Sequence, residues 1–236
     1  MPHRYLIKRG NSVCQLSCRK CKGKTRSGAE CKRNTCVYLP YCYQHCVSEL
    51  GLKISQSQIP NAGKGLYVWL PDCDYGSKIY DKNDTIFCSV IEEPMKLSTA
   101  ELNEIYGEDE TASYAISKAN TGAGSHVDFF CHRYLSCYAN DAQGSNFKNN
   151  CWGAFGYPRK PNGTCYWTFS LIAKGPIFNG DELLWSYGRS YWPEGQWHKQ
   201  GKNRARCDPQ VCKQKRGRTI KSCNAMKKYK KRKCIR

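Results

Sequence analysis

Short apolar runs separated by turn residues dominate the chain from residue 50 to about residue 197. Runs of four to eight apolar or alternating residues, bounded by Gly, Asn, Asp and Pro, are typical of β-strands. The pattern therefore predicts strands at residues 66–70, 85–91, 114–117, 165–172 and 182–186. A β-rich α+β domain is the expected fold class.

One segment of this region has helical periodicity instead. Ser98 and Glu101 have the spacing of a capping box, in which each side chain satisfies a backbone N–H of the other residue. Leu102, Ile105 and Tyr106 then supply one apolar face, and Gly107 can end the helix. We expect a short helix over residues 99–106.

Residues 14–46 are rich in cysteine and basic residues and poor in aliphatic ones. Such a segment has no hydrophobic core in which to place reduced cysteines, which favours a small module held together by metal. Eight side chains are candidate ligands, enough for two zinc ions: Cys14, Cys18, Cys21, Cys31, Cys36, Cys42, His45 and Cys46.

The best single zinc site combines three thiolates with one imidazole: Cys21, Cys31, Cys42 and His45. The last two residues have the C-x2-H spacing that lets neighbouring side chains chelate one ion, and Gly28 permits a tight turn before Cys31. Cys36 can replace any one of the thiolates. We expect a structural zinc site, whose basic surroundings leave contact with nucleic acid open.

Charge is distributed unevenly over the formal total of +19. Residues 1–50 hold 10 Lys/Arg and 2 Asp/Glu, residues 51–198 hold 12 and 16, and residues 199–236 hold 16 and 1. The net charges are therefore +8, −4 and +15. The aromatic-rich middle that must form the core is the acidic part, so we expect it to attract a basic partner.

The cellular compartment is predicted from the N-terminus and the cysteines. Residues 1–14 contain no apolar run after their positive charges, which predicts no signal peptide and an intracellular protein. No apolar stretch approaches the roughly 20 residues of a membrane span, so no membrane partner is expected. The 17 cysteines are odd in number and cluster toward both ends, which favours zinc thiolates over a secreted disulfide framework.

Three blocks of residues carry the candidate chemistry of the middle segment. The first is Ile-Pro-Asn-Ala-Gly-Lys-Gly at 59–65, the second is Tyr-Ala-Asn-Asp-Ala at 138–142, and the third is Asn-Gly-Asp-Glu-Leu-Leu-Trp-Ser-Tyr-Gly at 179–188. In this order and at these separations they resemble the SET-domain protein lysine methyltransferases. The resemblance covers residues 50 to about 192, and the last block is its most specific part.

The resemblance implies a fold, a cofactor and a reaction. The SET fold consists of several small sheets with a knotted C-terminal crossing, here over residues 50–197 after the zinc module at 14–46. It implies that Gly63, Lys64 and Gly65 hold S-adenosylmethionine, and that Asn140 locks the crossing and meets the adenine. Tyr187 corresponds to the catalytic tyrosine of the family.

Three further aromatic residues receive roles from the resemblance. Tyr114 corresponds to a second channel tyrosine, although an ordinary half-buried tyrosine is an equal alternative. Trp192 is the preferred aromatic residue to stack on adenine. Trp185 lies two residues before Tyr187, where relatives carry a residue that limits the number of methyl groups, or it is a core residue that faces away from the channel.

We therefore expect a histone lysine methyltransferase that uses S-adenosylmethionine. A narrow, tyrosine-lined channel would position the two reactants, exclude water and favour the neutral lysine amine. The middle block departs from the usual Asn-His-Ser-Cys of the family by reading Asn-Asp-Ala at 140–142. That departure keeps a second hypothesis open, namely a zinc-knot nucleic-acid or chromatin-binding protein with a catalytically silent SET-like module. A zinc knot followed by a SET domain resembles SET proteins of large DNA viruses and protists.

The third segment, residues 198–236, is polar and basic, and we expect a flexible tail. Its run of lysine and arginine at 227–233 is typical of nuclear import and of nonspecific contact with nucleic acid or nucleosomes, so the nucleus is the expected location. Its cysteines resemble the post-SET zinc tail of the family without the partner cysteine in the middle block, which leaves metal binding there open: Cys207, Cys212, Cys223 and Cys234.

Overall fold

The computed structural model describes residues 4–9, 12–35, 40–91, 95–107, 115–117, 126–129, 134–156, 167–192 and 200–208. Within these residues strands are frequent, and the helices are few and short. The predicted β-rich α+β class is therefore confirmed in this coarse form. The SET arrangement with its knotted crossing stays a prediction. No helix among the described residues is long and apolar enough to span a membrane.

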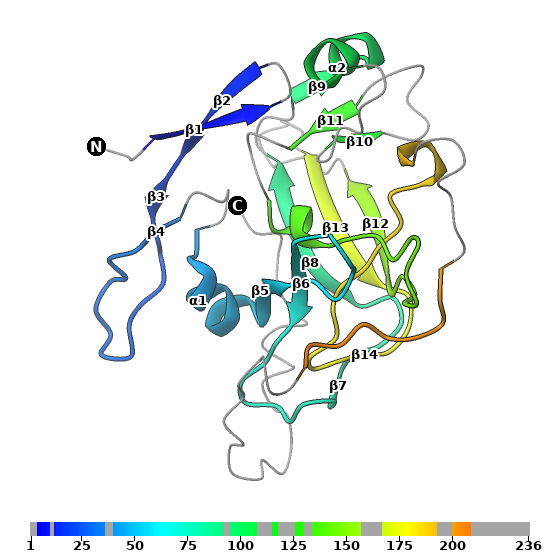
Figure 1. Cartoon of the computed structure of the whole chain (residues 1–236). Helices are drawn as coiled ribbons and strands as arrows, with labels where there is room; N and C mark the ends of the chain where they lie inside the picture. The colour runs from blue at the N-terminus through cyan, green and yellow to red at the C-terminus, as the bar shows by residue number, and fades with distance from the viewer. Residues whose placement is uncertain are drawn as a thin grey trace.

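The strands of the body pair in small antiparallel sheets (Figure 1). The central sheet consists of β12 (Cys151–Gly156), β13 (Trp167–Ala173) and β8 (Thr85–Ile91). A second sheet consists of β10 (Ala115–Ser117), β11 (His126–Asp128) and β9 (Met95–Leu97). Two further antiparallel pairs belong to the body: β5 (Leu52–Gln56) with β6 (Lys64–Val68), and β7 (Lys78–Tyr80) with β14 (Ile177–Phe178).

Four of the five predicted strands have a counterpart, and the fifth prediction was wrong. Residues 85–91 form β8 as predicted, and β6 lies two residues before the predicted 66–70. β10 and β13 overlap the predicted 114–117 and 165–172, of which residues 114, 165 and 166 lie outside the described residues. Residues 182–186 form isolated bridges instead, in which Glu182 pairs with Tyr67, Leu184 with Asn140 and Trp185 with Cys151. Residues 182–186 thus pair briefly with three other segments, and residues 182–185 are buried. Their burial explains why their sequence has the apolar character of a strand.

The N-terminal region lies to one side of these sheets (Figure 1). It contains the hairpin of β1 (Arg4–Arg9) and β2 (Ser12–Ser17), and the hairpin of β3 (Arg19–Lys20) and β4 (Asn34–Thr35). The one-turn helix α1 (Tyr43–His45) continues into the π-helical turn η1 (Cys46–Leu50), which leads into β5. Cys46 and Leu50 are buried in the main core, so η1 anchors this region to the body.

The predicted helix is α2 (Thr99–Tyr106), and its capping box is confirmed. The Ser98 hydroxyl accepts a hydrogen bond from the Glu101 N–H at 3.2 Å, and the Glu101 carboxylate accepts one from the Ser98 N–H at 2.7 Å. Gly107 follows with a φ of 94°, where a side chain would be strained. Local sequence therefore sets both ends of this helix.

Residues 200–208 belong to the packed body rather than to a flexible tail. The Cys207 N–H donates to the Gly180 carbonyl at 3.0 Å, and the Glu182 N–H donates to the Ala205 carbonyl at 2.9 Å. Arg206 forms an ion pair of 2.7 Å with Asp181, whose side chain is 1% exposed. The predicted tail began at residue 198. Its basic sequence could not reveal that one of its arginines pairs with a buried carboxylate, that of Asp181. Residues 209–236 lie outside the described residues.

The cysteines are only partly in the predicted state. Four cysteines in the described part of the chain are disulfide-bonded, which departs from the expectation of zinc thiolates alone: Cys18, Cys73, Cys88 and Cys207. Cys18 and Cys207 are therefore removed from the candidate metal ligands. The free cysteines include the three predicted zinc ligands, Cys21, Cys31 and Cys42. Spacing along the chain cannot reveal which thiols the fold brings within bonding distance.

Candidate functional site

The four predicted zinc ligands lie together in the structure. The ligand atoms of Cys21, Cys31, Cys42 and His45 are all within 4.8 Å of one another. The Nδ1 atom of His45 is 3.3 Å from the Cys21 Sγ and 3.4 Å from the Cys42 Sγ. Three soft thiol ligands and one imidazole are a tetrahedral donor set that fits a metal such as zinc.

The helix α1 and the segment that contains Gly23 and Lys24 position these ligands. Cys42 precedes α1 and His45 ends it, so one helical turn places both side chains on the same side. The His45 Nε2 lies 2.8 Å from the Lys24 carbonyl, which assigns the ring proton to Nε2 and leaves Nδ1 to bind metal. Gly23 packs against the His45 ring so closely that a Cβ would overlap it.

The electrostatics of the cysteines suit metal binding. Burial would raise the pKa of the Cys42 thiol, but hydrogen bonds from the His45 backbone and from the Cys21 and His45 side chains outweigh it and lower the pKa to about 7. Burial raises the pKa of Cys21. The low pKa makes Cys42 the thiol most ready to ionise, and the thiolate is the form that binds metal.

The other N-terminal candidate ligands are not part of this group. The Cys46 Sγ lies 3.6 Å from the Tyr41 carbonyl, and burial raises the pKa of Cys46 to about 12. Cys36 lies outside the described residues, and nothing is described of the Cys14 side chain. Among the described residues the grouping therefore matches the single site predicted from the sequence.

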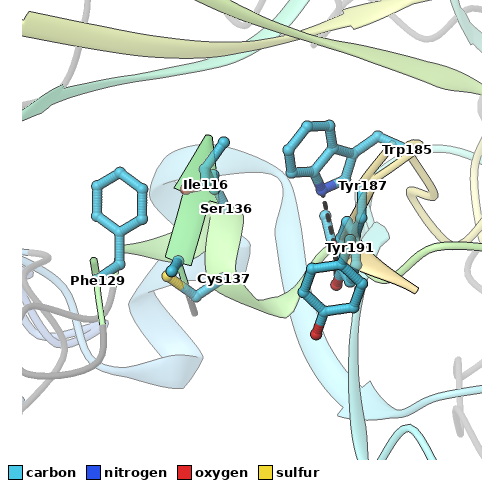
Figure 2. Close-up of a pocket in the computed structure, with 9 residues that line it drawn as sticks. Ile116, Phe129, Ser136, Cys137, Trp185, Tyr187 and Tyr191 are labelled. Atoms are coloured by element: carbon cyan, nitrogen blue, oxygen red, sulfur yellow. Dashed lines mark hydrogen bonds between the residues drawn. The ribbon is translucent and has the colours of Figure 1, made fainter. Parts of the chain in front are cut away.

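A second candidate site is a narrow pocket in the body (Figure 2). Its volume is about 30 Å³, and its lining is mostly apolar and aromatic: Ala115, Ile116, Phe129, Ser136, Cys137, Ala139, Trp185, Tyr187 and Tyr191. Figure 2 shows Ile116, Ser136, Cys137 and Phe129 on one side and Trp185, Tyr187 and Tyr191 on the other. These residues come from β10, from the position directly after β11, from η2 (Leu135–Tyr138) and the residue that follows it, and from the segment that ends in η3 (Arg189–Tyr191).

The pocket brings together two of the three aromatic residues predicted for a channel. Tyr187 and Trp185 both line it, and Trp185 also belongs to the apolar core, so a role of Trp185 in a channel stays a prediction. Tyr114 lies outside the described residues, although its neighbour Ala115 lines the pocket. The role of Tyr114 therefore stays a prediction.

One backbone carbonyl fixes both aromatic side chains. The Tyr187 hydroxyl and the Trp185 Nε1 each donate a hydrogen bond of 3.0 Å to the Ala139 carbonyl. The Trp185 ring also packs edge-on against Tyr187 at 5.3 Å between ring centroids. It lies over Gly153, where a Cβ would overlap the indole. The wall of the pocket is therefore rigid at the point where Tyr187 presents its hydroxyl.

Asn140 connects this wall to the glycine hairpin of β5 and β6. Its Nδ2 donates to the Lys64 carbonyl at 3.0 Å and to the Ser57 hydroxyl at 3.1 Å, and it lies 3.4 Å from the Glu182 Oε1. The backbone of Asn140 forms a parallel bridge with Leu184. The residue thus ties together three segments that are far apart in the sequence.

Glu182 is the buried centre of this connection, and the sequence analysis assigned it no role. Its carboxylate accepts hydrogen bonds from the Ser57 hydroxyl at 2.6 Å, the Gln58 N–H at 2.8 Å and the Tyr67 hydroxyl at 3.0 Å. Burial raises the pKa of Glu182, and these hydrogen bonds oppose the rise. Its position within the Asp-Glu-Leu block is the signal that could have identified it.

The two glycines of the predicted cofactor turn have different structural roles. Gly63 is exposed with a φ of +68°, and a Cβ there would meet no atom within 4 Å. Gly65 is buried, and a Cβ there would overlap the Glu182 carboxylate. Gly63 therefore leaves open space beside Lys64, which is exposed, and Asn140, which is partly exposed. Gly65 lets the hairpin approach Glu182.

Asp141 is a second residue that the sequence analysis did not assign, although the unusual Asn-Asp-Ala sequence marked its position. Its side chain is 3% exposed. One carboxylate oxygen accepts from the Tyr187 N–H at 2.9 Å and from the Trp192 Nε1 at 3.3 Å. The other accepts from the Asn149 side chain at 2.8 Å, the Gln143 N–H at 3.2 Å and the Gln200 side chain at 3.4 Å. Asp141 thus fixes the backbone of Tyr187.

Trp192 lies next to the pocket residues rather than among them. Its ring is nearly parallel to that of Tyr187, with 6.5 Å between centroids and 11° between planes. Tyr191 packs edge-on against both rings. Contact of Trp192 with adenine stays a prediction, while its contact with Tyr187 shows that it supports the pocket.

Comparisons with known proteins add no relative to this description. The sequence matches no model of a known protein family. It also matches no curated protein. The functional argument therefore depends on the two sites themselves.

Proposed function

We propose that the chain is a protein lysine methyltransferase that uses S-adenosylmethionine as the methyl donor. The observation that carries this proposal is the junction at Ala139 and Asn140. The Ala139 carbonyl holds Trp185 and Tyr187 at the pocket, and the next residue, Asn140, holds the open glycine hairpin. A narrow aromatic pocket and an open backbone site are thus joined through two consecutive residues.

The pocket suits a slim side chain that ends in an amine. Its volume of about 30 Å³ is small, which favours a narrow group over one as broad as a nucleoside. Aromatic and aliphatic walls can pack on the methylene groups of a lysine. The same walls disfavour an ammonium, so a lysine that enters becomes easier to deprotonate and can act as a nucleophile.

Tyr187 can orient the amine. Its hydroxyl proton points to the Ala139 carbonyl, so its oxygen can accept a hydrogen bond from an amine N–H. That contact would aim the nitrogen lone pair along the pocket. Asp141 and Trp185 hold the Tyr187 backbone and ring in place, so little reorganisation is needed when the amine arrives.

Gly63, Lys64 and Asn140 would hold the cofactor. Gly63 leaves open space at its Cβ position, and Lys64 and Asn140 are accessible beside it, so the residues present fit a ligand bound to backbone. When bound, S-adenosylmethionine supplies an electrophilic methyl group on a sulfonium. The chain would contribute positioning and exclusion of water, which are the main requirements of a displacement between two bound reactants.

The proposed substrate is a basic protein, with a histone tail as the first candidate. Residues 51–198, which contain the pocket, have four more acidic than basic side chains. Zinc in the Cys21, Cys31, Cys42 and His45 group would serve as a structural ion. A nuclear location and nonspecific nucleic-acid contact through residues 209–236 complete the proposal.

The test is transfer of labelled methyl from S-adenosylmethionine to a panel of histones and unrelated basic proteins. Tyr187→Phe should lose most of the transfer. Tyr75→Phe is the matched control, because the Tyr75 hydroxyl also donates to a backbone carbonyl, that of Cys207 at 2.7 Å, away from the pocket. If the parent transfers no label to any protein, the catalytically silent, nucleic-acid-binding hypothesis replaces this one.

A further inference from the structure

In the hairpin of β3 and β4 (residues 19–35, the metal-binding hairpin), residues 20–24 present two chemically different faces. Cys21 and Gly23 are buried, while Lys20, Lys22 and Lys24 are exposed. The alternation has the period of two residues that an extended chain imposes on its side chains. One face of the strand is directed at the metal-binding group, and the other carries lysines.

The metal-binding group enforces this alternation. Cys21 is one of the ligands, and Gly23 packs on the ring of another ligand, His45. Hydrogen bonds to the return strand hold the same register, from the Cys21 N–H to the Arg33 carbonyl and from the Cys31 N–H to the Gly23 carbonyl, both at 2.9 Å. The three lysines therefore form a row with about 6.6 Å between neighbours, which is the rise of two extended residues.

The row continues at the tip and on the return strand. Arg26 at the tip and Lys32 on the return strand are exposed, and Lys20 donates to the Lys32 carbonyl at 3.1 Å. Arg33 is exposed too, but it lies opposite Cys21 in the register and therefore on the other face. Residues 18–35 contain seven Lys/Arg and a single acidic residue, Glu30, which gives a net charge of +6. A zinc ion with three thiolates would lower this only by about one charge.

We propose that this metal-supported basic face, formed by Lys20, Lys22, Lys24 and Arg26, binds the phosphate backbone of a nucleic-acid duplex. A duplex carries one negative charge per about 1.7 Å of axis, so every lysine of a row finds a phosphate within reach. The hairpin lies to one side of the sheets, where a long rod-like partner can approach it (Figure 1). The contact is with phosphates, so it fixes the protein on the duplex without reading sequence.

This interaction does not depend on methyl transfer. It also differs from nucleic-acid contact through residues 209–236, because here the cations are held on a frame that the metal sets. A backbone whose register is already fixed loses little conformational freedom when its side chains bind. The hairpin should therefore contribute a defined share of the affinity in the full-length protein.

The experiment compares two triple variants of the full-length, zinc-loaded chain that remove the same charge. The test variant is Lys20→Gln with Lys22→Gln and Lys24→Gln. The control is Lys82→Gln with Lys148→Gln and Lys202→Gln, which are exposed lysines of the body. Binding of a short fluorescent DNA duplex is measured by anisotropy between about 50 and 200 mM salt.

The test variant should bind about tenfold more weakly or worse, and the slope of log K against log salt should become shallower by about 2–3, close to one for each lost phosphate contact. The control should change by less than about twofold. A third variant with arginine at positions 20, 22 and 24 should bind like the parent. Zinc content and circular dichroism show whether each variant keeps its fold.

Three results would overturn the proposal. Equal losses in the test and control variants would mean that only total charge matters. Unchanged binding in the test variant, with its zinc retained, would assign the affinity to other residues. Polyglutamate that competes with the duplex as well as unlabelled DNA does would identify an acidic protein as the partner class instead.

Discussion

The metal-binding hairpin and the body are stabilised in different ways. The hairpin has buried cysteines at its centre and exposed charges around them, so its fold depends on what the cysteines bind. The body has a continuous apolar core, within which Glu182 and Asp141 each collect several hydrogen-bond donors. The metal ligands lie within one short segment, whereas Glu182 joins segments that are more than a hundred residues apart, and Asp141 is hydrogen-bonded to a residue 59 positions away.

The two regions should therefore respond to different substitutions. Loss of one metal ligand should unfold the hairpin and leave the body folded, because Cys46 and Leu50, which follow the ligands, are held in the body's own apolar core. Loss of one buried polar partner should change the pocket without affecting metal binding. We expect substitutions in one region to leave the other region unchanged.

The largest effect is expected from Cys42→Ser. A structural zinc site contributes on the order of 10 kcal/mol to the folding of so small a module, so the variant should lose its metal and the hairpin its structure. Metal analysis and hydrogen exchange over residues 18–35 measure both. Cys46→Ser is the matched control, since Cys46 is a buried thiol outside the ligand group and its loss should leave the metal bound.

The next effect concerns the pocket. Tyr187→Phe removes a hydroxyl and keeps the ring, so the unfolding free energy should fall by only about 1 kcal/mol for the lost hydrogen bond to Ala139. Methyl transfer should fall by about 10²–10³, as for other positioned polar contacts at a reacting centre. Steady-state rates and isothermal titration with S-adenosylmethionine separate catalysis from binding. A folded variant with the parent's activity would make Tyr187 a core residue.

The metal group could be predicted from the sequence because its determinants are local. The Cys42 and His45 spacing fits one helical turn, and Gly28 does adopt the positive φ of +85° that a tight turn requires. The capping box of α2 was predictable for the same reason, since Ser98 and Glu101 are three residues apart. The four disulfide-bonded cysteines were not predictable, because long-range proximity leaves no trace in spacing.

The pocket could be predicted only in part. Trp185 and Tyr187 were found through a motif, but the carbonyl that fixes both belongs to Ala139, an unremarkable residue in sequence terms. The apolar sequence of residues 182–186 predicted a strand, although the segment pairs briefly with several partners. Asp141 received no role from the sequence and is a buried acceptor, because the fold brings its donors to it.

A smaller effect is expected from Gly65→Ala. The added methyl group would overlap the Glu182 carboxylate, which is fully buried and cannot move without losing its donors, so overpacking should cost about 2–3 kcal/mol. Affinity for S-adenosylmethionine should fall as well. Gly175→Ala is the control, because its Cβ would meet no atom within 4 Å and its stability should change by less than about 0.5 kcal/mol. Urea denaturation measures both, and equal stability of the two variants would contradict this account.

Asp141→Asn should have a somewhat smaller effect on stability, about 1–2 kcal/mol. Both carboxylate oxygens accept hydrogen bonds, so an amide must turn its own NH2 group toward a donor and leave that donor unsatisfied. The indole N–H resonance of Trp192 and the amide resonance of Tyr187 should both shift, while the metal content stays the same. Asp72→Asn, at an exposed position, should change neither resonance.

The smallest predicted effect is a dependence of body stability on pH through Glu182. Burial raises the native pKa of this carboxyl above its ordinary value of 4.5, so between 4.5 and the raised pKa the native state binds more protons than the unfolded state. Stability from this group is therefore fully present below pH 4.5 and is lost as the pH rises through the native pKa.

Metal binding changes with pH in the opposite direction: it weakens as the pH falls, since protons compete for the thiolates and His45. Comparison of the parent with Glu182→Gln cancels that contribution, because both proteins have the same metal group. Urea denaturation of the body, followed at several values between pH 4.5 and 7, should show the parent losing more stability than Glu182→Gln as the pH rises. Parallel curves would mean that the hydrogen bonds from Ser57, Gln58 and Tyr67 offset the burial completely.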